Sequence, residues 1–335
     1  MPFPERRSRR SRKLNPGLKP LVKEITTAVM INRLLIRIKV LQVLYAYYLR
    51  SNLTTDTALD LLEEELEASY RLYLTLCGLP IAFREIADER LLRETEKFVR
   101  SEDVLRVLNG ILSNPVFDKY AEEGTAFRTR YAEDLFVSAD LKEYHESVLD
   151  ALLADPETKD LDWSDAEAVK TWWRTKYGIY YLQNLAFEER LQDLTPFLND
   201  DILVVFTFVT KLVNAMDGTK GMDEIVKPRY SDDEVWTFGR QLLSTAIEKG
   251  AEYRNLIAGH FKNWDKNRVS EIDYIIMQMA IAEAVQFPLT PTTVIINEYL
   301  NLSHYYSAPN SHVYINGILH EILTKLKEDG SVLGV

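Results

Sequence analysis

The sequence predicts an all-α protein, and three observations support this class. Only 13 of the 335 residues are Gly and 12 are Pro, whereas Leu, Glu, Lys and Arg, which favour helices, are abundant. In most segments apolar residues recur at intervals of three and four, the period of an amphipathic helix. The apolar run at 202–209 is the one candidate for a buried strand, but it continues into "TKLVNAMDG" and has no partner strand elsewhere. We therefore expect helices throughout.

The composition is that of a folded protein in a reducing compartment. Apolar residues make up 46% of the chain and charged residues 27%, which suits one large domain or two ordinary ones. No run reaches the ~18 apolar residues of a membrane span, and no secretory signal is present. The single cysteine, Cys77, excludes an intrachain disulfide framework. We expect a cytoplasmic protein that does not interact with membranes.

The first fifty residues are basic, although the chain as a whole is acidic. Residues 1–50 contain twelve Lys or Arg and two Glu, against a net charge of −11 for the whole chain. Within residues 1–29, "RRSRRSRK" and the turn-rich "LNPGLKP" predict a disordered basic arm. Met30 would be the initiator if this arm is translated only from an upstream start. A localised basic end predicts an anion-binding surface, and the alternative is a solvated tail without a binding role.

Helices then follow one another to the end of the chain. The first is expected at 30–50, and the region 51–230 should form a folded helical insertion whose role the sequence does not reveal. Its helices are predicted at 55–77, 80–99, 101–109, 138–153, 164–192 with a break near Gly178, and 197–216, before a loop at 217–231. The C-terminal series, 231–328, should contain helices at 231–250, 251–262, 270–286, 292–306 and 311–328. Ser101, Ser164 and Ser311 are the expected N-caps of their helices.

Motifs for catalysis or cofactor binding are not found in the sequence. The five histidines show no spacing suited to a metal ion. There is no phosphate-binding Gly-rich loop, no Gly-x-Ser-x-Gly turn and no Cys/His nucleophile pattern. The aromatic residues at 172–181 are more typical of a core than of a base-stacking surface. We expect neither an enzyme nor a bound cofactor or metal.

Two C-terminal motifs and the first helix resemble the transcription antitermination factor NusB. The resemblance runs from "NWDKNR" at 263–268 to residue 319, and its most specific parts are "PTTVIINEYLNL" at 291–302 and "SHVYINGIL" at 311–319. The Arg-rich pattern of the family's first helix is matched by Arg33, Arg37, Gln42, Leu44 and Tyr45. The resemblance implies a NusB-like helical bundle built from the first helix and the C-terminal third, with residues 51–230 as an additional helical insertion.

This resemblance also implies a function. Members of the family bind a boxA-like single-stranded segment of the rRNA leader together with NusE, a ribosomal small-subunit protein. The complex joins the RNA polymerase elongation complex and suppresses premature termination. Arginines would meet phosphates, and an aromatic ring would meet a splayed base. The expected RNA contacts are Arg33, Arg37, Lys39, Asn310, Ser311 and Tyr314. Tyr45 and Asp273 match positions that face NusE in the family.

Within the closing motif, Asn316 and Gly317 lie inside a predicted helix, where Gly costs about 1 kcal/mol relative to Ala. In a tightly packed bundle, Gly317 would let a neighbouring helix approach closely, and Asn316 would offer its amide to a nearby backbone or loop. A direct RNA contact by this pair is the alternative. We also expect Arg33 and Arg37, which lie one helical turn apart, to be surface residues.

The sequence departs from the family in ways that leave alternatives open. Typical members are considerably shorter, bases or Ala often stand where this chain has Leu34, Leu35 and Ile36, and Asn310 replaces the usual loop acid. A helical protein-interaction module without RNA binding is one alternative. Another is a relative of the NusB-like domain of rRNA cytosine methyltransferases, but their Pro-Cys nucleophile and cofactor-binding α/β domain are missing. Neither the oligomeric state, the exact RNA sequence nor the natural status of residues 1–29 follows from the sequence.

Overall fold

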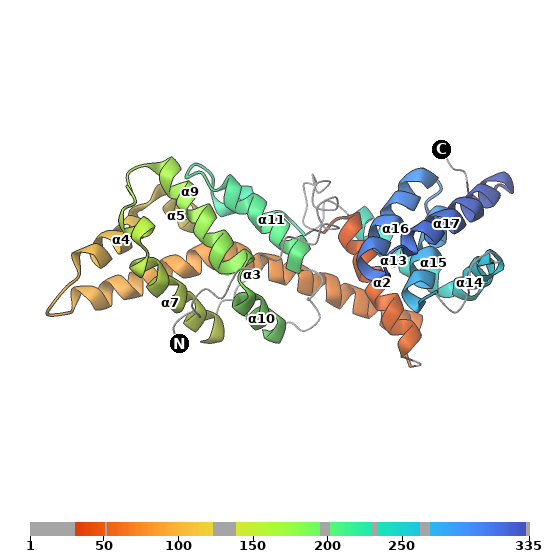
Figure 1. Cartoon of the computed structure of the whole chain (residues 1–335), viewed down its shortest axis with the longest axis horizontal. Coiled ribbons are helices and arrows are strands. Elements are labelled where there is room, and N and C mark those ends of the chain that lie inside the picture. Colours follow the sequence, from red (N-terminus) through yellow and green to blue (C-terminus); the bar gives the residue numbers. More distant parts are fainter. Residues whose placement is uncertain are drawn as a thin grey trace. The chain divides into compact units, whose positions relative to one another are not determined.

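The computed structural model describes residues 31–50, 52–122, 139–194, 202–229, 233–261 and 269–332, and every regular element in these ranges is helical (Figure 1). The predicted all-α class is confirmed. The chain divides into two compact units. Within the described ranges, the first unit comprises the residues between 32 and 64 and those from 233 onwards, and the second comprises residue 31 and the residues between 65 and 229. The expected basic arm, 1–29, lies outside the described residues.

The first unit is a helical bundle with α15 at its centre. Its helices are α2 (Arg33–Leu49), the beginning of α3 (Thr55–Thr95), α13 (Asp233–Glu248), α14 (Gly250–Gly259), α15 (Glu271–Gln286), α16 (Thr292–Tyr306) and α17 (Ser311–Glu328). Every residue of α15 from Ile275 to Ala284 is buried, and so is Asp273. A helix that is buried on all sides belongs in a core, which is why α2, α13, α14, α16 and α17 all pack against it.

Local contacts fix the directions of three of these helices. Ile36 lies beside Gly239 and Tyr48 beside Gly250, so α2 and the α13–α14 segment run in the same direction. Gln278, in the middle of α15, donates to the hydroxyl of Tyr48 near the end of α2 at 2.7 Å, whereas Glu283, closer to the end of α15, lies against the beginning of α2. Helices α2 and α15 therefore run antiparallel. The end of α2 lies beside the middle of α15.

Gly250, at the α13–α14 junction, lies close to the ends of two side chains. A Cβ atom at Gly250 would lie 2.5 Å from the hydroxyl oxygen of Tyr48 and 3.0 Å from the Nε2 atom of Gln278. The amide of Gln278 also donates to the carbonyl of Ala246 at 2.6 Å, which holds the junction against α15. A side chain at position 250 would force this hydrogen-bonded group apart.

The second unit contains more short helices than the sequence predicts. After the remainder of α3 come α4 (Glu102–Ser113), α5 (Pro115–Glu122), α7 (Ala139–Ala154), α8 (Pro156–Lys159), α9 (Ala166–Tyr177), the π-helix η1 (Gly178–Leu182), α10 (Leu185–Leu194), α11 (Ile202–Ala215) and α12 (Met222–Ile225). The predicted break near Gly178 is confirmed as η1. Ser101 caps α4 as predicted, but Asp165 rather than Ser164 caps α9. Helix α12 lies in the segment predicted to be a loop.

Helix α3 is continuous through Pro80, so the prediction of two helices at 55–77 and 80–99 is wrong. A proline inside a helix has no N–H for the carbonyl four residues earlier, here that of Leu76. The hydroxyl of Tyr177 donates to this carbonyl at 3.0 Å. The hydroxyl of Tyr120 donates to the next carbonyl, that of Cys77, at 2.9 Å. Tyrosines from α9 and α5 thus supply hydrogen bonds where proline interrupts the helical ladder.

The core of the second unit is aromatic. The ring of Trp173 lies 4.9 Å from that of Phe117 and 5.3 Å from that of Tyr177. The ring of Tyr177 lies 5.0 Å from that of Tyr181. Such edge-to-face and tilted pairs stabilise a core beyond the area that they bury. Trp172, Trp173, Tyr177 and Tyr181 are all buried, so they are core residues rather than a base-stacking surface.

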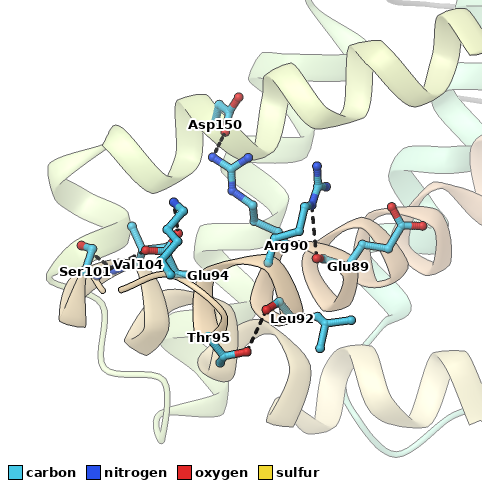
Figure 2. Close-up of polar contacts among 10 residues, drawn as sticks. Glu89, Arg90, Leu92, Glu94, Thr95, Ser101, Val104 and Asp150 are labelled. Atoms are coloured by element: carbon cyan, nitrogen blue, oxygen red, sulfur yellow. Dashed lines mark hydrogen bonds and ion pairs between the residues drawn. The ribbon is translucent and has the colours of Figure 1, made fainter. Parts of the chain in front are cut away.

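The turn between α3 and α4 is held by a buried carboxylate (Figure 2). Glu94 accepts from Lys97 Nζ at 2.5 Å and from the backbone N–H of Ser101 at 3.3 Å. Arg90 joins the end of α3 to Asp150 on α7 at 2.9 Å. Leu92, Phe98 and Val99 are exposed around this turn. Across the described ranges, no helix combines the length and the apolar character needed to cross a membrane.

Candidate nucleic-acid and partner interface of the first unit

The first group of site residues is a buried ion cluster that joins α2 to α15 and α16. The guanidinium group of Arg37 donates to both carboxylate oxygens of Glu283, at 2.6 and 2.8 Å. It also donates to Glu298 at 3.0 Å. The hydroxyl of Tyr299 donates to Glu283 at 2.8 Å. Two-pronged Arg–carboxylate pairs of this kind are among the stronger hydrogen bonds in proteins.

Because of this cluster, the prediction that Arg37 is a surface residue is wrong. Arg37 is only 4% exposed and Glu283 is fully buried. Burial alone would lower the pKa of Arg37, but the hydrogen bond and the charge of Glu283 raise it above its ordinary value, so the group stays charged. A guanidinium engaged by two carboxylates is not available for a phosphate. Arg37 therefore holds the bundle together and is not an RNA contact.

The two other predicted bases of α2 differ in exposure. Lys39 has no exposed surface, so the prediction that it contacts RNA is also wrong, because its ammonium group cannot meet a phosphate from inside the core. Arg33 is exposed, and its guanidinium lies over the ring of Phe238, 4.9 Å from the ring centre. Of the three bases, Arg33 alone is placed to meet a ligand.

The second group lies where α15 and α17 begin. Asp273 and Ser270 form a capping box, in which Ser270 Oγ accepts from the Asp273 N–H and the Asp273 carboxylate accepts from the Ser270 N–H at 3.0 Å. The hydroxyl of Tyr314, in the first turn of α17, donates to the same carboxylate oxygen, Oδ2, at 2.5 Å. It also lies 3.4 Å from Ser311 Oγ. One carboxylate thus connects the beginnings of two helices.

Burial separates the roles of these residues. Asp273 is 1% exposed, so the prediction that it contacts a protein partner directly is wrong. Tyr314 is half-buried. Burial, and then the hydrogen bond to Asp273, raise the pKa of Tyr314. The phenol therefore stays protonated at neutral pH and serves as a hydrogen-bond donor, while part of its ring faces solvent.

Helix α17 begins one residue away from the predicted cap. Asn310 is the N-cap residue, in a left-handed conformation with φ of 72° and without a side-chain capping bond, and Ser311 is the first helical residue. Asn tolerates this conformation better than most other residues. Asn310 is exposed, whereas Ser311 is 5% exposed. The first N–H groups of α17 donate no hydrogen bond to the Asn310 side chain.

The packing role predicted for Gly317 is wrong. Asn316 and Gly317 are both exposed, and a Cβ atom at position 317 would meet nothing within 4 Å. Their neighbours Ile315, Ile318 and Leu319 face the core instead. Glycine at this position therefore allows no close helix contact. Among the described residues no hydrogen bond from the Asn316 amide is found.

The predicted site residues fall at two ends of the bundle. Arg33 begins α2, whereas Tyr45, which is 39% exposed, lies twelve residues later, about 18 Å further along the helix axis. At this second end Arg254 packs over the rings of Tyr48 and Tyr274, 3.9 and 5.5 Å from their centres. Tyr45 thus lies nearer than Arg33 to the end of the bundle where α15 begins, which is where Asp273 and Tyr314 lie.

Sequence reasoning missed the acids of the buried cluster. Glu283 lies in "AIAEAV" and Glu298 in "VIINEY", and an acid within an apolar stretch is a signal for a buried ion pair. Part of the "PTTVIINEYLNL" motif is thereby structural, since Glu298 and Tyr299 belong to the cluster. In the described part of the chain, no group of three or more His, Cys, Asp or Glu side chains could hold a metal ion.

Comparison with known proteins identifies one matching family and several similar sequences. Residues 208–324 match the model of the NusB family. The transcription antitermination protein NusB of Koribacter versatilis is 32% identical over 114 residues, which cover 32% of this chain and 78% of that protein. NusB of Finegoldia magna is 34% identical over 95 residues, 28% of this chain and 69% of the relative. NusB of Nostoc punctiforme is 27% identical over 146 residues, 43% of this chain and 66% of the relative.

Most of the family match lies in the first unit. The family match begins inside α11 and covers α13 to α16 and most of α17, and α2 lies outside it. No solved structure matches the chain. The relatives carry the name of an antitermination protein rather than that of an enzyme.

Proposed function

This chain belongs to the NusB family, and on that premise we propose that it is a cytoplasmic transcription antitermination factor. In this proposal it binds a boxA-like single-stranded segment of the rRNA leader together with NusE, and the complex suppresses premature termination by the RNA polymerase elongation complex. The observation that carries the proposal is the similarity to relatives named as antitermination proteins. The retained motif at 311–319 supports it.

The proposed RNA contacts are the predicted residues that reach the surface or border it. Arg33 would bind a phosphate, because its guanidinium is exposed. The N–H groups at the beginning of α17, around Asn310 and Ser311, would attract a second phosphate through the helix dipole. Tyr314 would stack on a splayed base, since single-stranded RNA offers unpaired bases to aromatic rings.

The proposed surface for NusE is the end of α2. Tyr45 and Leu49 lie one helical turn apart and are 39% and 63% exposed. Exposed apolar side chains on neighbouring turns are suited to a protein partner. We propose that Tyr45 contacts NusE there. Asp273 contributes only indirectly because it is buried.

A salt series tests the RNA proposal. Each phosphate contact to single-stranded RNA contributes about 0.7 to the slope of log K against log salt, so Arg33→Gln should flatten the slope by about that amount. The change should weaken binding to different RNAs equally, since phosphates carry no sequence information. Fluorescence anisotropy with a labelled boxA RNA measures both quantities. Arg100→Gln, which changes an exposed arginine of the second unit, is the matched control and should leave the slope unaltered.

A pull-down with purified NusE, with and without boxA RNA, tests the partner. We expect capture in both cases, stronger with RNA, and a marked loss with Tyr45→Ala. The burial of Arg37 and Lys39 favours one alternative, a helical interaction module that binds protein but not RNA. NusE capture without any salt-dependent RNA binding would support that alternative and contradict the RNA part of the proposal.

A further inference from the structure

Beyond the residues that would touch RNA, we propose that Asp273 is a positioning residue, whose carboxylate fixes the ring of Tyr314 for stacking against a nucleobase. The inference rests on the proposed function, because it takes Tyr314 as the base contact. It assigns Asp273 a different role from the one that the sequence predicts. The buried acid would act on RNA only through the tyrosine.

Asp273 and Tyr314 differ in exposure. Asp273 is 1% exposed, so neither RNA nor a protein partner can reach its carboxylate in this arrangement. Tyr314 lies between this carboxylate and solvent, with its hydroxyl on Asp273 Oδ2 and its ring half-buried. A hydrogen bond to a charged acceptor is stronger than one between neutral groups. The accessible part of the pair is thus the ring, and the position of the ring is set by the hydroxyl.

Asp273 is itself held firmly. Its Oδ2 atom also accepts from the Oγ atom of Ser270 at 2.7 Å and from the N–H of Ser270 at 3.0 Å. These bonds tie the carboxylate to the first turn of α15, the helix at the centre of the bundle. The position of Tyr314 is therefore fixed relative to the core and not relative to a surface loop. A ring that is already fixed loses less conformational freedom when a base stacks on it.

Capping of α15 alone does not account for the arrangement. A capping carboxylate can remain solvated, yet the Oδ1 atom of Asp273 is buried and has no hydrogen-bond partner. Leaving a charged acceptor buried and unpaired is costly. The cost is understandable if burial beside Tyr314 serves a second purpose. That purpose, on this geometry, is to hold the ring where it borders solvent.

The test compares Asp273→Asn, Tyr314→Phe and the double variant in the full-length chain. Affinity for a boxA RNA is measured at several salt concentrations, and urea unfolding reports the fraction folded. Asp273→Asn should weaken binding roughly five- to tenfold, a part of what one stacked base contributes. The salt slope should stay unaltered because no phosphate contact is lost. In the Tyr314→Phe background, Asp273→Asn should cause no further loss of affinity.

A purely structural role gives a different pattern. If Asp273 only caps α15, its replacement should lower stability and leave the affinity of the folded protein unchanged, or lower that affinity equally in both backgrounds. Either result would overturn the proposal. Tyr305→Phe is the matched control, because it removes a buried hydroxyl that has no hydrogen-bond partner. This change should alter neither the affinity nor the salt slope.

A readout without RNA separates this inference from the proposed function. In protein labelled with fluorotyrosine, the ¹⁹F resonance of Tyr314 is assigned by its loss in Tyr314→Phe. Asp273→Asn should move that resonance towards the position of free tyrosine, and Tyr305→Phe should not. An unmoved resonance would refute the positioning role even if RNA binds. Failure of the unaltered chain to bind boxA RNA, with the resonance shifted as expected, would instead refute the proposed function.

Discussion

Arg37 of the first unit and His145 of the second are both buried, but in opposite ways. In the first unit a charged arginine is enclosed together with its acids, since Arg37 lies between Glu283 and Glu298. In the second unit a histidine is enclosed without charge, since His145 lies among aromatic rings and its Nδ1 atom is 3.1 Å from the hydroxyl of Tyr181. Burial lowers the pKa of His145 to about 4. The first unit should therefore be sensitive to the loss of a charge partner, and the second to acid.

The largest expected effect follows from unpairing the buried charges. Arg37→Gln leaves the carboxylate of Glu283 buried without its cation, and breaking a buried ion pair from one side costs about 3–5 kcal/mol of stability. We expect the free energy of unfolding of the first unit to fall by that amount in urea titrations. Arg33→Gln is the matched control on the same helix and should change stability by less than about 0.5 kcal/mol. Similar losses for both arginines would show that the cluster does not stabilise the bundle.

Lowering the pH should destabilise the second unit. The pKa of His145 is about 4 in the folded chain and about 6.5 in an unfolded one, so the unfolded state binds more protons between these values. Stability contributed by the neutral ring is complete above pH 6.5 and is lost as the pH falls to 4, by about 3 kcal/mol in total. Urea unfolding of the second unit across this range measures the loss. His145→Gln should lower stability at pH 7 but remove this part of the pH dependence. If His145→Gln kept the full pH dependence of the original chain, His145 would not be the group responsible for it.

The smallest effects concern two glycines of the first unit and should have opposite signs. Gly250→Ala would bring a Cβ atom against Tyr48 and Gln278, and overpacking costs about 1–3 kcal/mol. Gly317→Ala meets no neighbour and should stabilise α17 by up to about 1 kcal/mol through helix propensity. Thermal unfolding of both variants measures the two changes in stability. A lowered melting temperature for Gly317→Ala would restore the packing role that the structure removes.

The sequence predicts the helices well where local rules decide. The helices at 292–306 and 311–328 are found at the predicted residues, and Pro291 marks the beginning of the first of them. Local rules fail at Pro80, which ordinarily ends a helix. There the missing bond of Leu76 is supplied by Tyr177, 101 residues away along the chain. No local pattern contains that partner.

The site was harder to predict for the same reason. Helical spacing correctly places Arg33 and Arg37 one turn apart, but it does not reveal which turn is covered by other helices. The partners of Arg37 lie 246 and 261 residues further along the chain. Similarly, Tyr314 and Asp273 are 41 residues apart, and nothing in either segment indicates their hydrogen bond. Exposure and pairing of polar residues arise from tertiary packing, which the helical period alone does not encode.

The single cysteine makes the second unit open to a simple chemical measurement. Cys77 is fully buried, and burial raises the pKa of its thiol, so the reactive thiolate is scarce in the folded chain. A thiol reagent can label it only when α3 and the tyrosines around it separate. The labelling rate therefore reports the opening of this unit. It gives the second unit a kinetic signal of its own, whatever happens to the bundle that carries the proposed RNA site.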